Sequence, residues 1–296
     1  MAALIGSLTF IVYCVSRPSK RPYLVTPQAF SHISGRVLKE TDESWSNRDG
    51  SRARGWLLRG GEGAPAVVLM HRYGADRSWL FNLGVKINET TNFTILWPDL
   101  RGHGLNPLVS WTSFGAREGT DVLAALDFLN NLKSDNQKKL VRDGFGVYGV
   151  ELGAYSALKA AQADNRIRVL VLDSIPRSPD ELMKDSVTSC VGVDNRLLQY
   201  LARTAMKIYL MGAYENLSAC DFAGSLRDQR VLLLSGSDAG YLKESTASLD
   251  SCFKNRPNVE TRTDLPLSGL NLPSATGEQG EGYDRIVIEY FDRHLR

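Results

Sequence analysis

The stretch that decides the fold of this chain is FGVYGVELGAYSAL, residues 145–158. A short apolar run ends at Gly149, Glu151 follows one residue later, and an alanine-rich helical run begins after Gly153. Two glycines at this spacing let a strand and a helix pack closely around a central residue whose backbone is strained. The stretch therefore predicts a buried strand, a sharp turn centred on Glu151 and a helix.

Outward from this turn, apolar strands alternate with helices. We predict strands at residues 36–40, 52–58, 66–70, 93–97, 144–148, 168–172, 230–235 and 258–262. We predict helices at residues 117–132, 152–163, 241–253 and 283–295. The first two strands are expected to form a hairpin, and the fully apolar run at 66–70 is typical of a strand buried on both faces. This alternation predicts a central, mostly parallel sheet flanked by crossover helices.

One segment interrupts the alternation. Residues 175–226 are helix-prone, most clearly at 197–210, and we interpret them as a helical cap inserted over the carboxyl edge of the sheet. A long polar loop at 264–282, rich in Gly, Ser and Pro, separates the last strand from the last helix. We therefore predict one α/β domain over residues 35–296 that includes the cap.

The N-terminus differs from the rest of the chain. Residues 1–16 carry no charge and are mostly apolar, but they are fewer than the roughly 18–20 residues that span a bilayer. Three interpretations stay open: a short or start-truncated membrane anchor, a signal-like apolar region, or an apolar helix packed on the domain. Residues 17–34 are expected to be a linker, because their three prolines are incompatible with a regular helix.

The charges that follow this apolar segment bear on localisation. Arg17, Lys20 and Arg21 come directly after it. If the segment is an anchor, these positive charges favour a cytoplasmic position for the main domain, an inference that is lost if residues are missing before Met1. We expect the protein to be membrane-associated through its N-terminus or cytoplasmic, with its orientation open.

Composition excludes several classes of function. With 35 basic and 33 acidic residues, the net charge of +2 offers no electrostatic basis for nucleic-acid binding. The glycine-rich run at 60–63 lacks the Lys-Ser/Thr and helix of a phosphate-binding loop, so no cofactor is expected. Cysteines at positions 14, 190, 220 and 252 lack metal-ligand spacing. We expect them to be structural thiols and expect no metal, with a Cys190–Cys220 bridge left open.

Four further motifs surround the central turn. HRYG (71–74) and DLRGHG (99–104) each follow a predicted strand, FGARE (114–118) leads into the helix before the turn, and GSD (236–238) follows a late strand. With the G-x-E-x-G at 149–153, this order resembles the α/β-hydrolase superfamily, whose nucleophile elbow reads G-x-S-x-G. The resemblance covers roughly residues 35–296 and implies the fold of esterases and serine peptidases.

The resemblance also implies positions for the site residues. Family members transfer an acyl group to a serine, which a histidine deprotonates and an acid orients, while two backbone N–H groups stabilise the oxyanion. By position, Glu151 occupies the nucleophile site and Asp238 the acid site. The oxyanion donors would be the backbone N–H groups of Leu152 and Tyr73.

Three departures from the family pattern argue against catalysis. Glutamate replaces serine at 151, and its side chain is one methylene longer than the aspartate that some members use as nucleophile. The loop at 264–282, where the family histidine is expected, contains none; the chain's four histidines are at positions 32, 71, 103 and 294. Arg72 stands where a glycine normally lets the oxyanion loop turn. With His71 it is expected to line the pocket, and we hypothesise that it pairs with Glu151.

These departures favour a catalytically inactive pseudo-hydrolase that binds a ligand or partner. The first alternative is an active hydrolase of ester or amide bonds, in which Glu151 acts as nucleophile or base with Asp238, His71 or His103 assisting. The second alternative is a pure protein-interaction domain. The expected partner is a small-molecule ligand or an acyl-type substrate, and residues 1–16 are the candidate membrane attachment.

Overall fold

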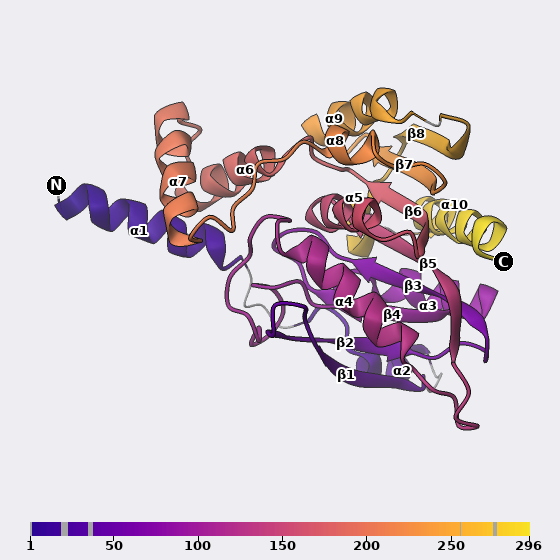
Figure 1. The fold of residues 1–296 in the computed structure, drawn as a ribbon. Helices are drawn as coiled ribbons and strands as arrows, with labels where there is room; N and C mark the ends of the chain where they lie inside the picture. The colour runs from indigo at the N-terminus through magenta and orange to yellow at the C-terminus, as the bar shows by residue number, and fades with distance from the viewer. Residues whose placement is uncertain (1, 19–22, 35–37, 255, 275–276) are drawn as a thin grey trace.

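The computed structural model describes residues 2–18, 23–34, 38–254, 256–274 and 277–296. Within these residues an eight-stranded sheet crosses the molecule in the order β1-β2-β4-β3-β5-β6-β7-β8, with helices on both faces (Figure 1). β2 pairs antiparallel with β1 and β4, and the other neighbouring strands run parallel. The predicted mostly parallel sheet flanked by helices is confirmed.

The strands are β1 (Glu40–Ser46), β2 (Arg52–Leu58), β3 (Ala64–Met70), β4 (Thr94–Pro98), β5 (Val141–Val150), β6 (Ile167–Asp173), β7 (Arg230–Gly236) and β8 (Val259–Leu265). The helices are α1 (Ala2–Ser16), α2 (Pro27–Ser34), α3 (Phe81–Thr91), α4 (Glu118–Asn130), α5 (Leu152–Ala163), α6 (Pro179–Val191), α7 (Arg196–Tyr209), α8 (Ala219–Ala223), α9 (Tyr241–Leu249) and α10 (Gly277–Leu295). Short 3₁₀ turns include η2 (Asp250–Cys252) and η4 (Gly269–Ser274).

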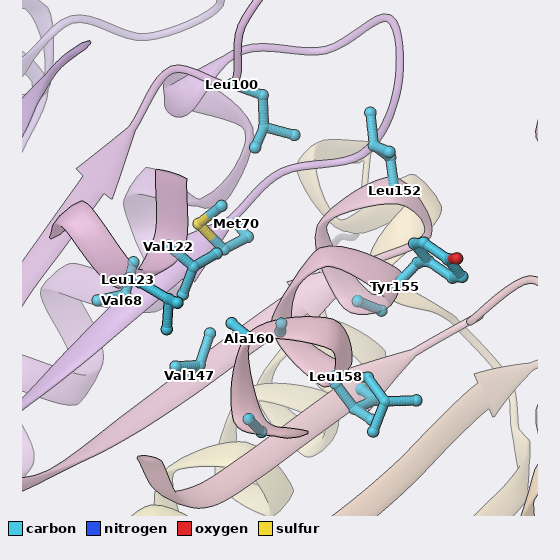
Figure 2. Close-up of a cluster of buried hydrophobic side chains, with 14 of the residues drawn as sticks. Val68, Met70, Leu100, Val122, Leu123, Val147, Leu152, Tyr155, Leu158 and Ala160 are labelled. Atoms are coloured by element: carbon cyan, nitrogen blue, oxygen red, sulfur yellow. The ribbon is translucent and has the colours of Figure 1, made fainter. Parts of the chain in front are cut away.

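The central strands build one apolar layer on each face of the sheet. On the face covered by α4 and α5, Val68 of β3 and Val147 of β5 share a buried cluster with Leu158 of α5, as Figure 2 shows. On the face covered by α3 and α10, Val67 belongs to a second cluster with Phe291. Because successive side chains of a strand point to opposite faces, fully apolar strands are buried on both sides.

Two helices differ from the sequence prediction. α3 was not predicted; inside it, a Cβ at Gly84 would lie 2.3 Å from the Trp97 ring, so glycine leaves room for the indole. α2 begins at Pro27 within the expected linker. Proline fits the first turn of a helix, where its missing N–H needs no partner, so the linker prediction was wrong there.

Several boundaries also shift. β1 begins at Glu40 rather than near residue 36, and residues 35–37 lie outside the described part of the chain. α10 begins at Gly277, inside the segment predicted as loop, and α9 ends at Leu249 where η2 follows. The strand at 52–58 and the helix at 152–163 are confirmed at both ends.

The N-terminal helix packs on the inserted segment. α1 lies against α6 and α7, and its Ile11, Val12 and Val15 join the larger core cluster. The N–H of Thr112 donates to the Ser16 carbonyl at 2.9 Å. None of the described helices is both long enough and apolar enough to cross a bilayer.

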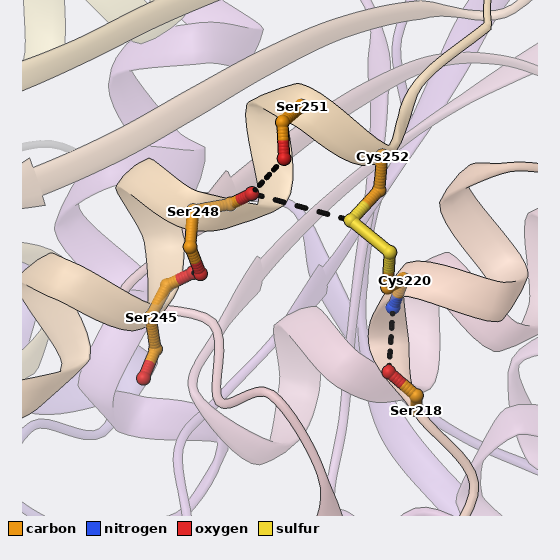
Figure 3. Close-up of a disulfide and its surroundings, with 6 residues drawn as sticks. All are labelled: Ser218, Cys220, Ser245, Ser248, Ser251 and Cys252. Atoms are coloured by element: carbon orange, nitrogen blue, oxygen red, sulfur yellow. Dashed lines mark hydrogen bonds between the residues drawn. A yellow bond between two sulfur atoms is a disulfide. The ribbon is translucent and has the colours of Figure 1, made fainter.

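Two disulfides correct the expectation of free structural thiols. Cys14 of α1 pairs with Cys190 of α6, and Cys220 of α8 pairs with Cys252 of η2 (Figure 3). The partners are 176 and 32 residues apart, so only the packing of α1 on α6 and of α8 on η2 brings them together. The Cys190–Cys220 bridge left open by the sequence is not formed.

Candidate functional site

The turn between β5 and α5 has the strained geometry that its glycines predict. Glu151 adopts φ 51° and ψ −107°, and its N–H donates to the Asp173 carbonyl at 2.9 Å. A Cβ at Gly149 would lie 2.4 Å from the Gly153 carbonyl carbon, and one at Gly153 would lie 2.2 Å from the Met70 oxygen. Both glycines are therefore required for strand and helix to approach.

The Glu151 side chain points into the place where two backbone donors meet. The Tyr73 N–H donates to Oε2 at 2.8 Å, and the Leu152 N–H also stabilises the ionised carboxylate. In acyl-transfer enzymes such a pair of N–H groups binds the oxyanion of the tetrahedral intermediate. The structure thus brings together Tyr73, Leu152 and Glu151, and the two backbone N–H groups serve the Glu151 carboxylate.

Burial makes Glu151 hard to ionise. The pKa of this carboxyl is raised to about 7, chiefly by desolvation and in smaller part by the negative charge of Asp185 on α6. The positive charge of Arg72 and the two N–H donors lower it in part. Glu151 therefore gives up its proton at a higher pH than an ordinary glutamate does.

Arg72 interacts with an aromatic ring. Its guanidinium carbon lies 4.5 Å from the centroid of the Trp79 ring, a cation–π geometry. None of the ion pairs among the described residues joins Arg72 to Glu151, so the positive charge of Arg72 acts on that carboxyl at longer range. Arg72 Nη1 instead donates to the neighbouring Tyr73 carbonyl at 3.4 Å.

The two nearby histidines are buried and neutral. His71 Nδ1 contacts the Arg72 carbonyl at 2.8 Å, and His71 Nε2 accepts the Leu100 N–H at 3.0 Å. His103 Nδ1 contacts the Arg101 carbonyl at 2.8 Å. Burial lowers the pKa of His71 to about 4 and that of His103 to about 3. With these partners both rings hold loops in place, and neither bonds to the Glu151 carboxylate.

Asp238 lies after β7, as the resemblance implies, and it is bound by an amide. Asn271 Nδ2 of η4 donates to Asp238 Oδ2 at 2.8 Å. η4 lies in the loop after β8, where the family histidine is expected. An amide donates the same hydrogen bond to the acid as an imidazole does, but it cannot accept a proton near neutral pH. Sequence reasoning missed Asn271, because only the fold shows which loop residue reaches the acid.

A second buried carboxyl beside the turn was also missed. Asp173, at the end of β6, accepts hydrogen bonds from Ser174 Oγ at 2.6 Å, the Gly269 N–H at 3.0 Å and Tyr283 Oη at 2.5 Å. The Tyr283 and Tyr148 hydroxyls lie 2.6 Å apart. Burial raises the pKa of Asp173 to about 6. This network joins β5, β6, η4 and α10 beneath the turn.

The site loop is also tied to the N-terminal helix. The Tyr73 hydroxyl donates to the Val15 carbonyl of α1 at 2.7 Å, and the Tyr73 ring stacks on Phe114 with centroids 5.5 Å apart. The residue whose N–H binds the Glu151 carboxylate is therefore held by α1. Among the described residues, no group of three or more metal-ligating side chains comes together.

Comparisons with known proteins agree with this architecture. No protein-family model and no curated protein matches the sequence. An esterase from Pyrococcus furiosus superposes with a TM-score of 0.72 at 18% identity, over 95% of this chain and 98% of that one. An acylaminoacyl peptidase from Pyrococcus horikoshii gives 0.63 at 14% identity, over 92% of this chain and 44% of that one. An esterase from Thermogutta terrifontis superposes with a TM-score of 0.57 at 16% identity, over 86% of this chain and 100% of the esterase.

The sheet order, the strained turn and these structures define an α/β-hydrolase fold. Within that fold, this protein carries Glu151 at the elbow and an Asp238–Asn271 pair after β7 and β8.

Proposed function

We propose that this α/β-hydrolase-like protein is a non-catalytic binding protein. The observation that carries the proposal is the Glu151 carboxylate, which accepts the Tyr73 N–H at 2.8 Å and so takes the place of a substrate oxyanion. An anion-binding pair already occupied by the chain's own charge has no free donor for a developing oxyanion.

The absence of a proton acceptor in the right place adds support. A working nucleophile needs a base within hydrogen-bond reach. Here Asn271 makes the hydrogen bond to Asp238, and the buried His71 and His103 are engaged with backbone carbonyls. A small acyl-type ligand or a partner chain is the occupant we propose for the surface around the elbow.

A second candidate function rests on one specific observation. Burial raises the pKa of Glu151 to about 7, which suits a general base at neutral pH. In this alternative the protein is an active hydrolase of ester or amide bonds, and Glu151 activates the attacking water. The esterase neighbours share the fold and are compatible with either function.

Hydrolysis of short- and medium-chain aryl esters separates the two. We would compare the full chain with Glu151→Ala, Glu151→Ser and the double variant Glu151→Ser/Asn271→His. The proposal expects no turnover above background in the wild type and in Glu151→Ala. It expects turnover to appear in the double variant, which restores a hydroxyl and an imidazole, and to vanish again when Asp238→Asn is added.

Ester turnover by the wild type distinguishes a non-catalytic protein from an active hydrolase. Turnover by the wild type that Glu151→Ala abolishes would establish Glu151 as catalytic and would overturn the non-catalytic proposal. Turnover that is equal in both would place the chemistry elsewhere and also count against it. The Glu151→Gln variant serves as the matched control, because it keeps the shape of the side chain and removes its charge.

A further inference from the structure

Helix α7 is apolar on the side that faces away from the protein. Its inner side buries Ala202 and Met206. Exposed apolar side chains lie at Leu197, Tyr200, Ile208 and the following Met211, with exposed fractions of 66%, 57%, 75% and 94%. Leu197, Tyr200 and Ile208 lie three and eight residues apart, which places them on one face of α7, and Met211 follows just beyond the end of the helix. Several exposed apolar side chains on one face of a helix are typical of an interaction site.

Positive charge borders this apolar face. At 100° per residue, Arg196, Arg203 and Lys207 fall along one edge of the exposed stripe. A groove of about 230 Å³ between α6 and α7 is lined by Lys184, Arg196, Tyr200 and Arg203 among others. Asp180, in the same groove, pairs with Arg203. The groove therefore keeps an excess of cations beside the apolar stripe.

Helix α1 extends the same surface. Phe10 and Tyr13 expose 61% and 48% of their area. The Arg17 guanidinium lies over the Tyr13 ring at 4.6 Å and interacts with Tyr209 at the end of α7, which joins the two helices. In Figure 1, α1 and α7 project from the side of the molecule away from the C-terminus. No acidic residue precedes Glu40 in the sequence.

We propose that this α1–α7 surface, made of Phe10, Tyr13, Leu197, Tyr200, Ile208 and Met211, docks on an anionic lipid bilayer. The apolar side chains enter the boundary between headgroups and acyl chains, while Arg196, Lys207 and the groove contact lipid phosphates. An exposed apolar face bordered by Lys and Arg is the pattern of helices that lie in the plane of a membrane. The basic residues on the border favour a lipid bilayer over an apolar protein face as the occupant. Anionic headgroups attract these residues, whereas an apolar protein face does not.

This inference is independent of the function proposed for Glu151, because the elbow and the α1–α7 surface share no side chain. It also differs from an anchor formed by residues 1–16 alone, since it assigns half of the contact to α7. A cross-link through Cys14 and Cys190 holds α1 on α6, next to α7.

Vesicle flotation with the full, oxidised chain tests the proposal. Liposomes of phosphatidylcholine with roughly 30 mol% of the anionic lipid phosphatidylglycerol would be compared with liposomes of phosphatidylcholine alone. We expect binding to the anionic vesicles that is at least about tenfold stronger, and that weakens as salt screens the charges.

Two variants locate the contact. Ile208→Asp, at an exposed position, is expected to reduce anionic-vesicle binding about tenfold or more, as is Lys207→Glu. Leu108→Asp is the matched control, because Leu108 is 55% exposed and lies outside the α1–α7 surface. It is expected to bind like the wild type. Thermal melts check that each variant is folded.

Three results would overturn the proposal. The first is no binding to anionic vesicles. The second is binding that Ile208→Asp leaves unchanged while Phe10→Asp abolishes it, which would make α1 alone the anchor. The third is a dimer in light scattering that Ile208→Asp dissociates without any effect on vesicles, which would assign the surface to a second copy of the chain.

Discussion

At the residue scale, ionisation of the buried Glu151 carboxyl lowers the stability of the folded protein. The carboxyl is held in a strained turn, and burial raises its pKa to about 7 from an ordinary value near 4.5. The folded state therefore binds a proton more tightly than the unfolded chain does between these two values. Stability is highest when the group is protonated and is lost as pH rises from about 4.5 through 7.

Glu151→Gln is expected to remove this loss. Above pH 8 the variant should be more stable than the wild type by up to about 3 kcal/mol, because each unit between the folded and unfolded pKa corresponds to about 1.4 kcal/mol. Near pH 4 the two should be equally stable. Denaturant unfolding at both pH values measures the difference.

The stability of the wild type must be compared with that of Glu151→Gln at each pH, because other buried carboxyls titrate in the same pH range. Burial also raises the pKa of Asp173 and of Asp121 to about 6, so the wild-type curve alone mixes their contributions. A Glu151→Gln chain with an unchanged pH profile would show that the Glu151 carboxyl is well solvated in solution.

Residue-level contacts of this kind were the least predictable part of the site. The Glu151 position follows from G-x-E-x-G, and Tyr73 and Leu152 follow from the motif order. Asn271 and Tyr283 do not, because their partners Asp238 and Asp173 lie 33 and 110 residues away. No local sequence pattern indicates which side chains meet across such long separations in the sequence.

At the scale of elements, the elbow depends on the missing side chains of its glycines. A Cβ at Gly153 would lie 2.2 Å from the Met70 oxygen, which belongs to the backbone of β3 and cannot rotate away. Gly282 of α10 offers a contrast, since nothing lies within 4 Å of a Cβ placed there.

Gly153→Ala is expected to destabilise the protein by about 3 kcal/mol or more, because α5 must move away from the sheet. Gly282→Ala, the matched control, is expected to stabilise it by up to about 1 kcal/mol through helix propensity. Chemical denaturation of both variants measures the two effects. Equal stabilities would mean that the helix can shift at little cost.

Strands and helices were predicted correctly where the spacing of apolar residues alone determines them. Apolar strands and the helix at 152–163 could be read from periodicity, because burial on both faces of a sheet demands it. α2 could not, because Pro27 was expected to prevent a helix and instead stands at its first position. α3 was not predicted either, and the close contact of Gly84 with the Trp97 ring inside it is a tertiary feature.

At the scale of the whole molecule, one disulfide fastens α1 to α6 and the other fastens α8 to η2. Cys14→Ser/Cys190→Ser is expected to lower stability by about 2–4 kcal/mol, because the unfolded chain regains the freedom of a long closed loop. The same variant should make α1 susceptible to protease before the rest of the chain. Unfolding and limited proteolysis measure both effects.

The second disulfide is the comparison for the first. Cys220→Ser/Cys252→Ser opens a shorter loop and is expected to leave protease protection of α1 intact while it lowers stability. Early cleavage of α1 in this variant as well would show that α1 is held by the overall stability of the fold and not by its own cross-link.

The redox state of the same two disulfides depends on the compartment in which the protein folds. Disulfides persist in oxidising compartments and are reduced by the thiol buffers of the cytosol. All four cysteines of the chain are paired here. Protein recovered from an oxidising compartment should therefore resist alkylation completely, whereas protein made and kept in the cytosol should take up four alkyl groups. Counting those groups by mass would therefore show whether the protein was kept in an oxidising or a reducing compartment.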